Sequence, residues 1–115
     1  MFVQVYCKES LIADMIVDLT AKAVQEYHRY TNDILLLPFG AIESPNYLAF
    51  VDFLESRCPP RKRANIKELL SNWNLLEYDP LAIVRRTHGL MYADFIWVRF
   101  DEEDITYDQI KIRPD

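Results

Sequence analysis

The clearest helical signal in the chain lies in residues 44–60, which read SPNYLAFVDFLESRCPP. Ser44 followed by Pro45 is typical of a helix N-cap and a first helical position. The apolar side chains that follow recur at the spacing of one helix face: Tyr47, Leu48, Val51 and Leu54. We expect the helix to end near Arg57 and Cys58, because a residue that precedes a proline avoids the helical conformation.

Two further helices are predicted between this helix and Gly89. The second covers about residues 61–73, where one helical face is apolar and the opposite face is basic. The apolar face is formed by Ile66, Leu69, Leu70 and Trp73. The third helix begins at Asp79 and Pro80, which repeat the cap and proline signature, and it runs to about His88, where Gly89 ends it.

The N-terminal part of the chain predicts strands, but one stretch allows two interpretations. Residues 2–8 are rich in strand-forming residues and predict a strand. Residues 12–31 fit either a hairpin, with strands at 12–19 and 24–31, or an amphipathic helix. The β-branched and aromatic content favours the hairpin. Its turn, Thr20-Ala21-Lys22, lacks the Asn-Gly or Asp-Gly pair that would decide between the two.

The segments that flank the helical region lead out of the sheet and back into it. The apolar run at residues 34–40 is expected to be a buried connector from the sheet to the helices. Residues 95–100 are aromatic and β-branched, and they predict a strand that is central in the sheet or covered on both sides. Residues 101–104 predict an acidic turn, and residues 105–107 and 109–112 predict a last strand or an extended arm.

The order strands, helices, strands predicts a single α+β domain over residues 1–115. Its expected parts are a small N-terminal antiparallel β-meander, three short central helices and C-terminal strands that return to the sheet. Hydrophobic residues make up 50% of the chain, which is ample material for the core of one domain.

Composition excludes several classes of protein. The net charge of −5 argues against a general nucleic-acid binder. The only two glycines, Gly40 and Gly89, rule out glycine-rich phosphate loops. No signal peptide pattern is visible, and no apolar stretch approaches the roughly 18 residues of a membrane span. Two distant cysteines, Cys7 and Cys58, do not form a disulfide framework, so we expect a cytoplasmic protein with free thiols and no membrane association.

A nucleophilic site would have to be built from Cys58, His88 and either Asp94 or Asp79. The spacing of these residues carries no signature, and a thiol at a helix C-terminus has a raised pKa. We therefore favour a structural cysteine and a helix-capping histidine. The two histidines and two cysteines have no metal-ligand spacing, and residues 101–104 lack the ligand register of a calcium loop. The sequence predicts no catalytic residues, no metal and no cofactor.

Positive charge is concentrated in residues 57–86, which hold seven basic and three acidic residues, whereas the segments on both sides are acidic. The basic residues are Arg57, Arg61, Lys62, Arg63, Lys67, Arg85 and Arg86. If the second and third helices pack side by side, these residues form a patch that binds a partner protein or, less favoured, nucleic acid. An ordinary solvated helix face explains the same residues equally well. Mimicry of nucleic acid by the acidic segments is disfavoured, because the acidic residues are dispersed.

From Leu36 onward, the chain carries a series of motifs that resembles a known module. The motifs are Leu37-Pro38-Phe39-Gly40, Phe53-Leu54 with Arg57, Pro60, Arg63, Tyr78-Asp79-Pro80, His88-Gly89, and Asp94 with Trp97. The module is fused in front of, or encoded beside, HipA-like serine/threonine kinases of Firmicutes and mobile elements. The resemblance implies that residues 1–35 form the opening β-meander of that module.

The resemblance brings no kinase activity to this chain, which has no glycine-rich loop and no catalytic Asp/Asn loop of the kinase type. It implies a standalone accessory domain of a toxin–antitoxin or prophage system, and it names no catalytic residues. The matched positions are Arg57, Pro60, Arg63, His88, Asp94 and Trp97. An Arg–Asp pair that holds the helices to the sheet would explain several of them, and Arg63 with a buried carboxylate such as Asp94 is one candidate pair.

The leading functional hypothesis is a non-enzymatic regulatory protein that binds a partner protein, with a HipA-like kinase as the expected partner. The alternative is a phage or mobile-element inhibitor of a host defence nuclease, of the anti-CRISPR kind. A small hydrolase that uses Cys58 and His88 is the least favoured hypothesis. Nucleic acid is a weak alternative partner, through the basic segment at residues 57–86.

Overall fold

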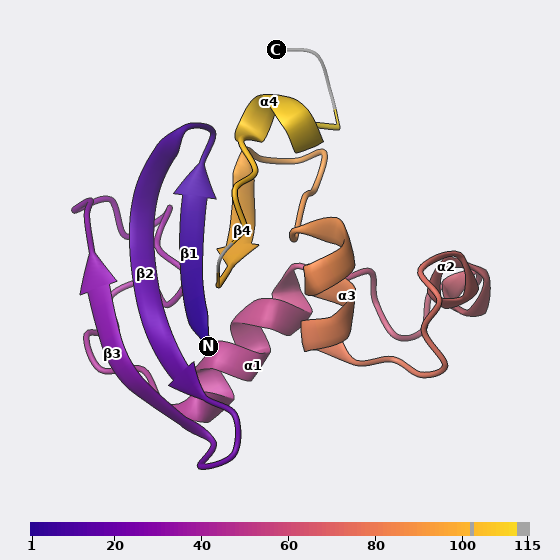
Figure 1. The fold of residues 1–115 in the computed structure, drawn as a ribbon, viewed down its shortest axis with the longest axis horizontal. Coiled ribbons are helices and arrows are strands. Elements are labelled where there is room, and N and C mark those ends of the chain that lie inside the picture. The colour runs from indigo at the N-terminus through magenta and orange to yellow at the C-terminus, as the bar shows by residue number, and fades with distance from the viewer. Residues whose placement is uncertain (102, 113–115) are drawn as a thin grey trace.

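A four-stranded antiparallel sheet forms the centre of the protein in this computed structural model, which describes residues 1–101 and 103–112. Its strands are β1 (Phe2–Cys7), β2 (Ser10–Asp18), β3 (Ala23–Arg29) and β4 (Ile96–Phe100), in the order β3-β2-β1-β4 (Figure 1). The helices are α1 (Tyr47–Ser56), α2 (Ile66–Asn72), α3 (Pro80–Thr87) and α4 (Tyr107–Ile110). The predicted α+β fold is confirmed, together with its N-terminal meander and its returning C-terminal strand.

Residues 12–31 lie within the hairpin of β2 and β3 and its exit, so the hairpin interpretation is confirmed and the helical alternative is wrong. The turn is held by Asp18, whose Oδ1 accepts hydrogen bonds from the amides of Thr20 and Ala21, both at 2.9 Å. Lys22 then adopts a left-handed conformation with φ of 54°. A side-chain oxygen of Asp18 therefore stabilises a turn that has no Asn-Gly pair.

The β1–β2 register contains a bulge that increases the number of buried side chains on β2. Val5 pairs with Ala13 and Tyr6 with Leu11, which leaves Ile12 as an extra residue. An extra residue in one strand interrupts the strict alternation of faces. As a result, Ile12 and Ala13 are both buried although they are neighbours in the chain.

Strand β4 lies at the edge of the sheet, next to β1 only, so the prediction of a central strand is wrong. The alternative prediction, a strand covered on both sides, is confirmed: Trp97 and Val98 point to opposite faces and are 1% and 0% exposed. The end of α3 closes the outer edge. The amide of Val98 donates to the carbonyl oxygen of His88 at 2.8 Å, and the Val98 carbonyl oxygen lies 3.1 Å from Nδ1 of His88. This cover leaves the middle of β4 without unpaired edge groups.

Helix α1 begins later than the cap and proline signature predicts. Asn46, and not Ser44, is the N-cap, because its Oδ1 accepts a hydrogen bond from the amide of Ala49 at 2.8 Å. The helix starts at Tyr47 and reaches its C-cap at Arg57, close to the predicted end. The predicted helix is therefore confirmed, but its start was placed at the wrong one of two capping residues.

The second and third helices are also confirmed, with a shorter α2 than expected. Residues 61–65 form turns, so α2 covers only Ile66–Asn72. Helix α3 follows its predicted signature: Asp79 is the N-cap, with Oδ1 3.1 Å from the amide of Leu81, and Pro80 is the first helical residue. His88 is the left-handed C-cap with φ of 57°, and Gly89 continues the turn with φ of 68°.

The segment after β4 contains a helix where the sequence predicts a strand or an extended arm. Helix α4 begins after Thr106, whose amide donates to Oε1 of Gln109 at 2.8 Å. Tyr107 is 4% exposed, and the carbonyl of Ile105 accepts a hydrogen bond of 3.2 Å from Arg99 on β4. The segment therefore folds back along the sheet. A Thr followed three residues later by Gln is a capping-box signature that predicts this helix start.

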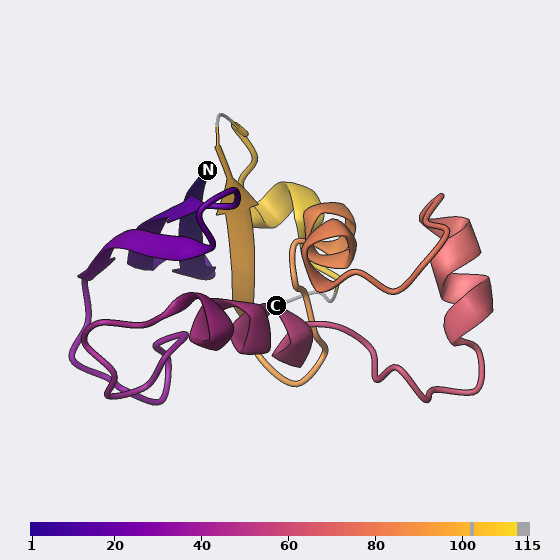
Figure 2. The ribbon, with the colours of Figure 1, turned by 90° about the horizontal axis from the view of Figure 1, so that it is seen from below.

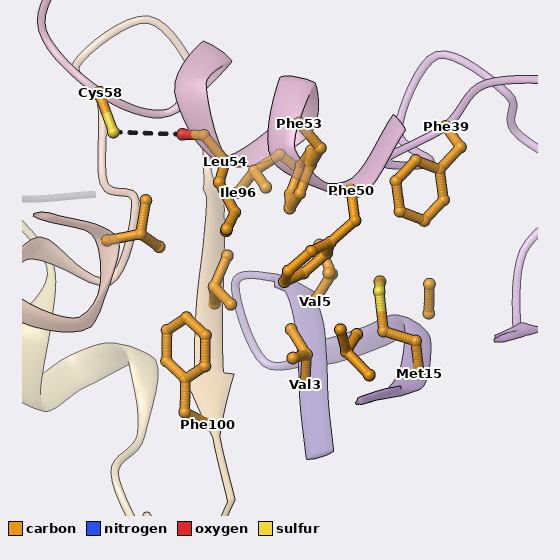
Figure 3. Close-up of a cluster of buried hydrophobic side chains, with 14 of the residues drawn as sticks. Val3, Val5, Met15, Phe39, Phe50, Phe53, Leu54, Cys58, Ile96 and Phe100 are labelled. Carbon is orange, nitrogen blue, oxygen red and sulfur yellow. Dashed lines mark hydrogen bonds between the residues drawn. The ribbon is translucent and has the colours of Figure 1, made fainter. Parts of the chain in front are cut away.

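The main core lies between the sheet and the layer formed by α1 and α3 (Figure 3). Phe50 of α1 is 0% exposed and lies over Val3 and Val5 of β1, with Met15 and Phe100 at its sides (Figure 3). A phenylalanine buried in this way contributes roughly 1.5–3 kcal/mol relative to an exposed one. The run at residues 34–40 is only partly the buried connector predicted for it. Its members Leu37 and Phe39 are buried, whereas Ile34 and Leu35 are exposed.

Residues 59–79, which we call the arm, project from this body and carry α2 at their tip (Figures 1 and 2). Two hydrogen bonds hold the arm. The hydroxyl of Tyr78 donates to the carbonyl of Pro59 at 2.6 Å and so joins the two ends of the arm. Nε of Arg86 on α3 donates at 3.1 Å to the carbonyl of Trp73, the C-cap of α2, while α2 itself stands away from the sheet (Figure 2).

Candidate functional site

The seven basic residues predicted to form one patch occupy three different environments. Arg57 is buried beside β4. On α3, Arg85 lies over the ring of Phe100 with its guanidinium 4.8 Å from the ring centroid, while Arg86 donates to the carbonyl of Trp73 at the end of α2. The four others are exposed on the arm: Arg61, Lys62, Arg63 and Lys67. The structure therefore excludes Arg57 from any surface patch. Arg85 and Arg86 are exposed, but Arg85 is held by Phe100 and Asp101, and Arg86 by the carbonyl of Trp73. The four arm residues remain as the candidate binding surface.

Arg57 belongs to the interior framework of the protein. Its Nε donates to the carbonyl of Gly89 at 2.8 Å, and its two terminal nitrogens donate to the two oxygens of Asp94, each at 2.8 Å. One terminal nitrogen also donates to the carbonyl of Ile96 at 3.0 Å. An Arg–Asp pair exists, and its arginine is Arg57, not the candidate Arg63. Arg57 is the C-cap of α1, and its bonds to Gly89 and Ile96 place that end of the helix against the segment before β4.

Gly89 allows this close approach of Arg57. A Cβ atom at position 89 would lie 3.2 Å from Cβ of Arg57, and the φ of 68° is one that other residues rarely adopt. The His88-Gly89 pair therefore has two roles: it ends α3, and it leaves space for the side chain of Arg57. Both roles concern the fold and explain the matched motif without a ligand.

The cations on the arm differ in how strongly they are held. Nε of Arg61 donates to Oε1 of Glu55 at 2.9 Å, and its guanidinium lies 4.3 Å from the ring centroid of Tyr78. Lys62, Arg63 and Lys67 form no ion pair with any carboxylate in residues 1–101 and 103–112. Three cations on the arm are therefore available to a partner, whereas Arg61 is partly neutralised.

A cleft of about 400 Å³, which we call the arm cleft, lies between the arm and the body. Arg63, Leu69 and Trp73 line it from the arm. Leu90, Met91 and Ile112 are among the residues that line it from the body. Met91 is 37% and Ile112 is 39% exposed, so apolar surface remains open to solvent there. A volume of this size is within the usual range of ligand-binding cavities.

The residues considered for a nucleophilic site each make contacts that hold the fold, and Sγ of Cys58 lies near the start of α3, 3.7 Å from the carbonyl of Pro80. Sγ of Cys58 lies 3.2 Å from the carbonyl of Leu54, and burial raises the pKa of this thiol to about 11. His88 caps α3 and contacts β4, while Asp94 binds Arg57. The other carboxylate considered, Asp79, caps α3. The structural interpretation of Cys58 and His88 is confirmed, although burial, more than the helix dipole that we invoked, explains the raised pKa.

The acidic turn after β4 is part of the fold. Oδ1 of Asp101 accepts a hydrogen bond from the amide of Phe2 at 3.0 Å, and Oε1 of Glu103 accepts one from the amide of Phe100 at 2.7 Å. Glu102 lies outside the described residues. Among the residues that the structure describes, no group of three or more His, Cys, Asp or Glu side chains is arranged to hold a metal ion.

The residues that line the body side of the arm cleft were not predicted from the sequence. Leu90, Met91 and Tyr92 follow Gly89 in a loop, and three large apolar residues in a row are unusual there. That run was the signal that could have drawn attention to the loop. Ile112 carried no such signal, because it joins the cleft only through the path of the chain after α4.

Comparison with protein families, with curated proteins and with solved structures found no match to this chain. The resemblance to the module of HipA-like kinases therefore rests on the motifs alone. Within residues 1–101 and 103–112, none of the helices has the length and apolar character needed to cross a membrane.

Proposed function

We propose that the chain is a non-enzymatic regulatory protein that binds a partner protein through its arm. The observation that carries the proposal is the exposed set of Lys62, Arg63 and Lys67 on a segment that projects from the body. The chain as a whole has a net charge of −5, so this local excess of positive charge stands out. Opposite charges on two surfaces speed their association and orient the encounter.

The contacts of the reactive side chains support a non-enzymatic role. Cys58 is buried with a pKa raised to about 11, so its thiolate is scarce at neutral pH. His88 and Asp94 take part in hydrogen bonds that hold α3, α1 and β4 together. Each of the three would have to leave a structural contact before it could take part in catalysis.

A HipA-like kinase in the cytoplasm is the partner that we propose. The motif resemblance suggests it, and most of the matched residues have structural roles that would preserve the shape of such a module. Arg63 is the exception, because it is exposed and lines the arm cleft. Its position supports a role in binding.

The test is a binding measurement between the full chain and a HipA-like kinase encoded in the same genome, followed by an assay of kinase activity in the complex. The arm variant combines Lys62→Gln with Lys67→Gln. A matched control removes two positive charges from the β2–β3 hairpin by Lys22→Asn in its turn and Arg29→Gln at the end of β3. Asn is chosen at position 22 because it tolerates the left-handed backbone there.

We expect the wild type and the control to bind alike, and the arm variant to bind several-fold more weakly. Equal binding by all three proteins would contradict the arm as the binding surface. Absence of any complex with the kinase would contradict the partner. A complex with a host defence nuclease, weakened by the arm variant, would support the arm as the binding surface and favour the inhibitor hypothesis.

A further inference from the structure

The arm cleft combines an apolar lining with one cation at its edge. Trp73 and Leu69 from the arm face a lining from the body that includes Met91 and Ile112. Apolar surface that stays open beside a polar rim is typical of a binding site on a protein. The cleft is therefore suited to an apolar group that arrives with a negative charge beside it.

Only one of the two arginines at the cleft can supply that charge contact. Arg57 already donates four hydrogen bonds to Asp94, Gly89 and Ile96, so its guanidinium is occupied. Arg63 is exposed and, within the part of the chain that the structure describes, pairs with no carboxylate. A guanidinium in this position matches the geometry of an incoming carboxylate.

We propose that the arm cleft binds an acidic segment of a partner protein, taking one bulky apolar side chain against Trp73 and Met91 while a neighbouring carboxylate pairs with Arg63. This inference rests on the proposed function and names the chemistry that the partner must present. Charge complementarity selects the acidic segment, because Lys62 and Lys67 flank Arg63 on the arm. The apolar lining selects a protein over nucleic acid, whose phosphates would leave that lining exposed.

The experiment is selection from a random-peptide phage library on the wild-type chain, followed by affinity measurements of the selected peptides on the Met91→Glu variant. That substitution places a negative charge in the cleft at a partly exposed position, where the fold tolerates it. Leu35→Glu is the matched control, because Leu35 is 90% exposed in the loop between β3 and α1 and does not line the cleft. Circular dichroism of each variant checks that the fold is retained.

We expect the selected peptides to share one bulky apolar residue next to Asp or Glu. Their affinity should fall by about tenfold or more on Arg63→Gln and on Met91→Glu, as for residues at the centre of an interface, and stay unchanged on Leu35→Glu. Binding should also shift the indole N–H resonance of Trp73 in an NMR spectrum, while that of the buried Trp97 stays in place.

Three results would overturn the proposal. They are a lack of enriched peptides, enriched peptides without acidic residues, and peptides that bind Met91→Glu as tightly as the wild type. Displacement of the peptides by single-stranded DNA at comparable concentration would instead assign the cleft to nucleic acid and also overturn it. If the partner kinase responds to the arm variant but not to Met91→Glu, the cleft inference fails while the proposed function stands.

Discussion

Arg57 and Asp94 are joined by two parallel hydrogen bonds of 2.8 Å across 37 residues of the chain. The pair connects the C-terminal end of α1 to the segment that leads into β4. The side chain of Arg57 is 8% exposed and that of Asp94 is 39% exposed, so the arginine is buried while the carboxylate reaches the surface. Together with the contacts of Arg57 to Gly89 and Ile96, the pair holds the helical layer against the edge of the sheet.

Replacement of Arg57 by Met should destabilise the protein by about 3 kcal/mol, because it removes two hydrogen bonds to Asp94 and one to each of two carbonyl groups. Urea unfolding followed by circular dichroism measures this loss. Arg61→Met is the matched control: its pair with Glu55 is solvent-exposed, with side chains 54% and 41% exposed, and should contribute about 1 kcal/mol or less. Equal losses for the two variants would contradict a special role for Arg57.

The start of α1 can be tested by a pair of cap substitutions. Asn46→Ala should cost about 1 kcal/mol, because it removes the acceptor for the amide of Ala49. Ser44→Ala should change the free energy of unfolding by less than about 0.5 kcal/mol, since Ser44 is exposed and lies before the cap. A larger loss of stability for Ser44→Ala than for Asn46→Ala would support Ser44 as the N-cap of α1, as expected from the sequence.

The two thiols should differ in reactivity. Burial raises the pKa of Cys58 to about 11 and also raises the pKa of Cys7, which is only half-buried. We expect the Cys7→Ser variant to react with dithionitrobenzoate at pH 8 only after unfolding. Rapid labelling of this variant in its folded state would show that Cys58 is accessible and would reopen the question of a nucleophile.

The same thiol gives the stability of the protein a dependence on pH. The folded state holds the proton of Cys58 up to about pH 11, whereas the unfolded chain releases it near 9.0. The contribution is therefore fully present below pH 9 and is lost as pH rises from about 9 to 11. The free energy of unfolding of the wild type should fall toward that of Cys58→Ala over this interval, and a constant difference between the two would contradict it.

Helix α4 should act as a cover for the sheet. Tyr107→Ala is expected to destabilise the protein by about 3 kcal/mol, because it removes a buried aromatic side chain that is 4% exposed. Tyr92→Ala is the control, since Tyr92 is 72% exposed, and it should cost little. Thermal unfolding compares the two. A small loss of stability for Tyr107→Ala would contradict the packing of α4 and favour the extended C-terminal segment that the sequence predicts.

The charge on the arm should act mainly on the rate of association. Lys62→Gln with Lys67→Gln should lower the association rate with the partner about threefold or more at low salt, with little change in dissociation. The difference from the wild type should shrink as salt rises, because the screening length falls to about 8 Å at physiological ionic strength. Surface plasmon resonance across a salt series measures both rates. A difference that is independent of salt would contradict electrostatic steering.

Features that depend on a few neighbouring residues, such as the two ends of α3, were predicted correctly from the sequence. Asp79, Pro80 and Gly89 predict α3 with its two ends, because a cap, a fixed proline φ and a left-handed glycine are properties of the local backbone. Two local signals were present but overlooked. Asp18 holds the turn of the first hairpin, and Thr106 with Gln109 begins α4.

Other features depended on which distant segments meet. Ser44 and Asn46 are both good caps, so capping preference alone does not choose between them, and in the folded chain Asn46 is the cap. The apolar faces of β4 predict a strand that is central or covered on both sides, and only the fold decides between the two: β4 lies at the edge, beside the end of α3.

The sequence by itself determined the class of fold, the three central helices and the positive charge of residues 57–86. Tertiary structure alone decided that Arg57 is the partner of Asp94 while Arg63 stays at the surface, and it alone created the arm cleft. The physical reason is that propensity, capping and charge are carried by neighbouring residues. Ion pairs and clefts, in contrast, form between side chains that only the folded chain brings together.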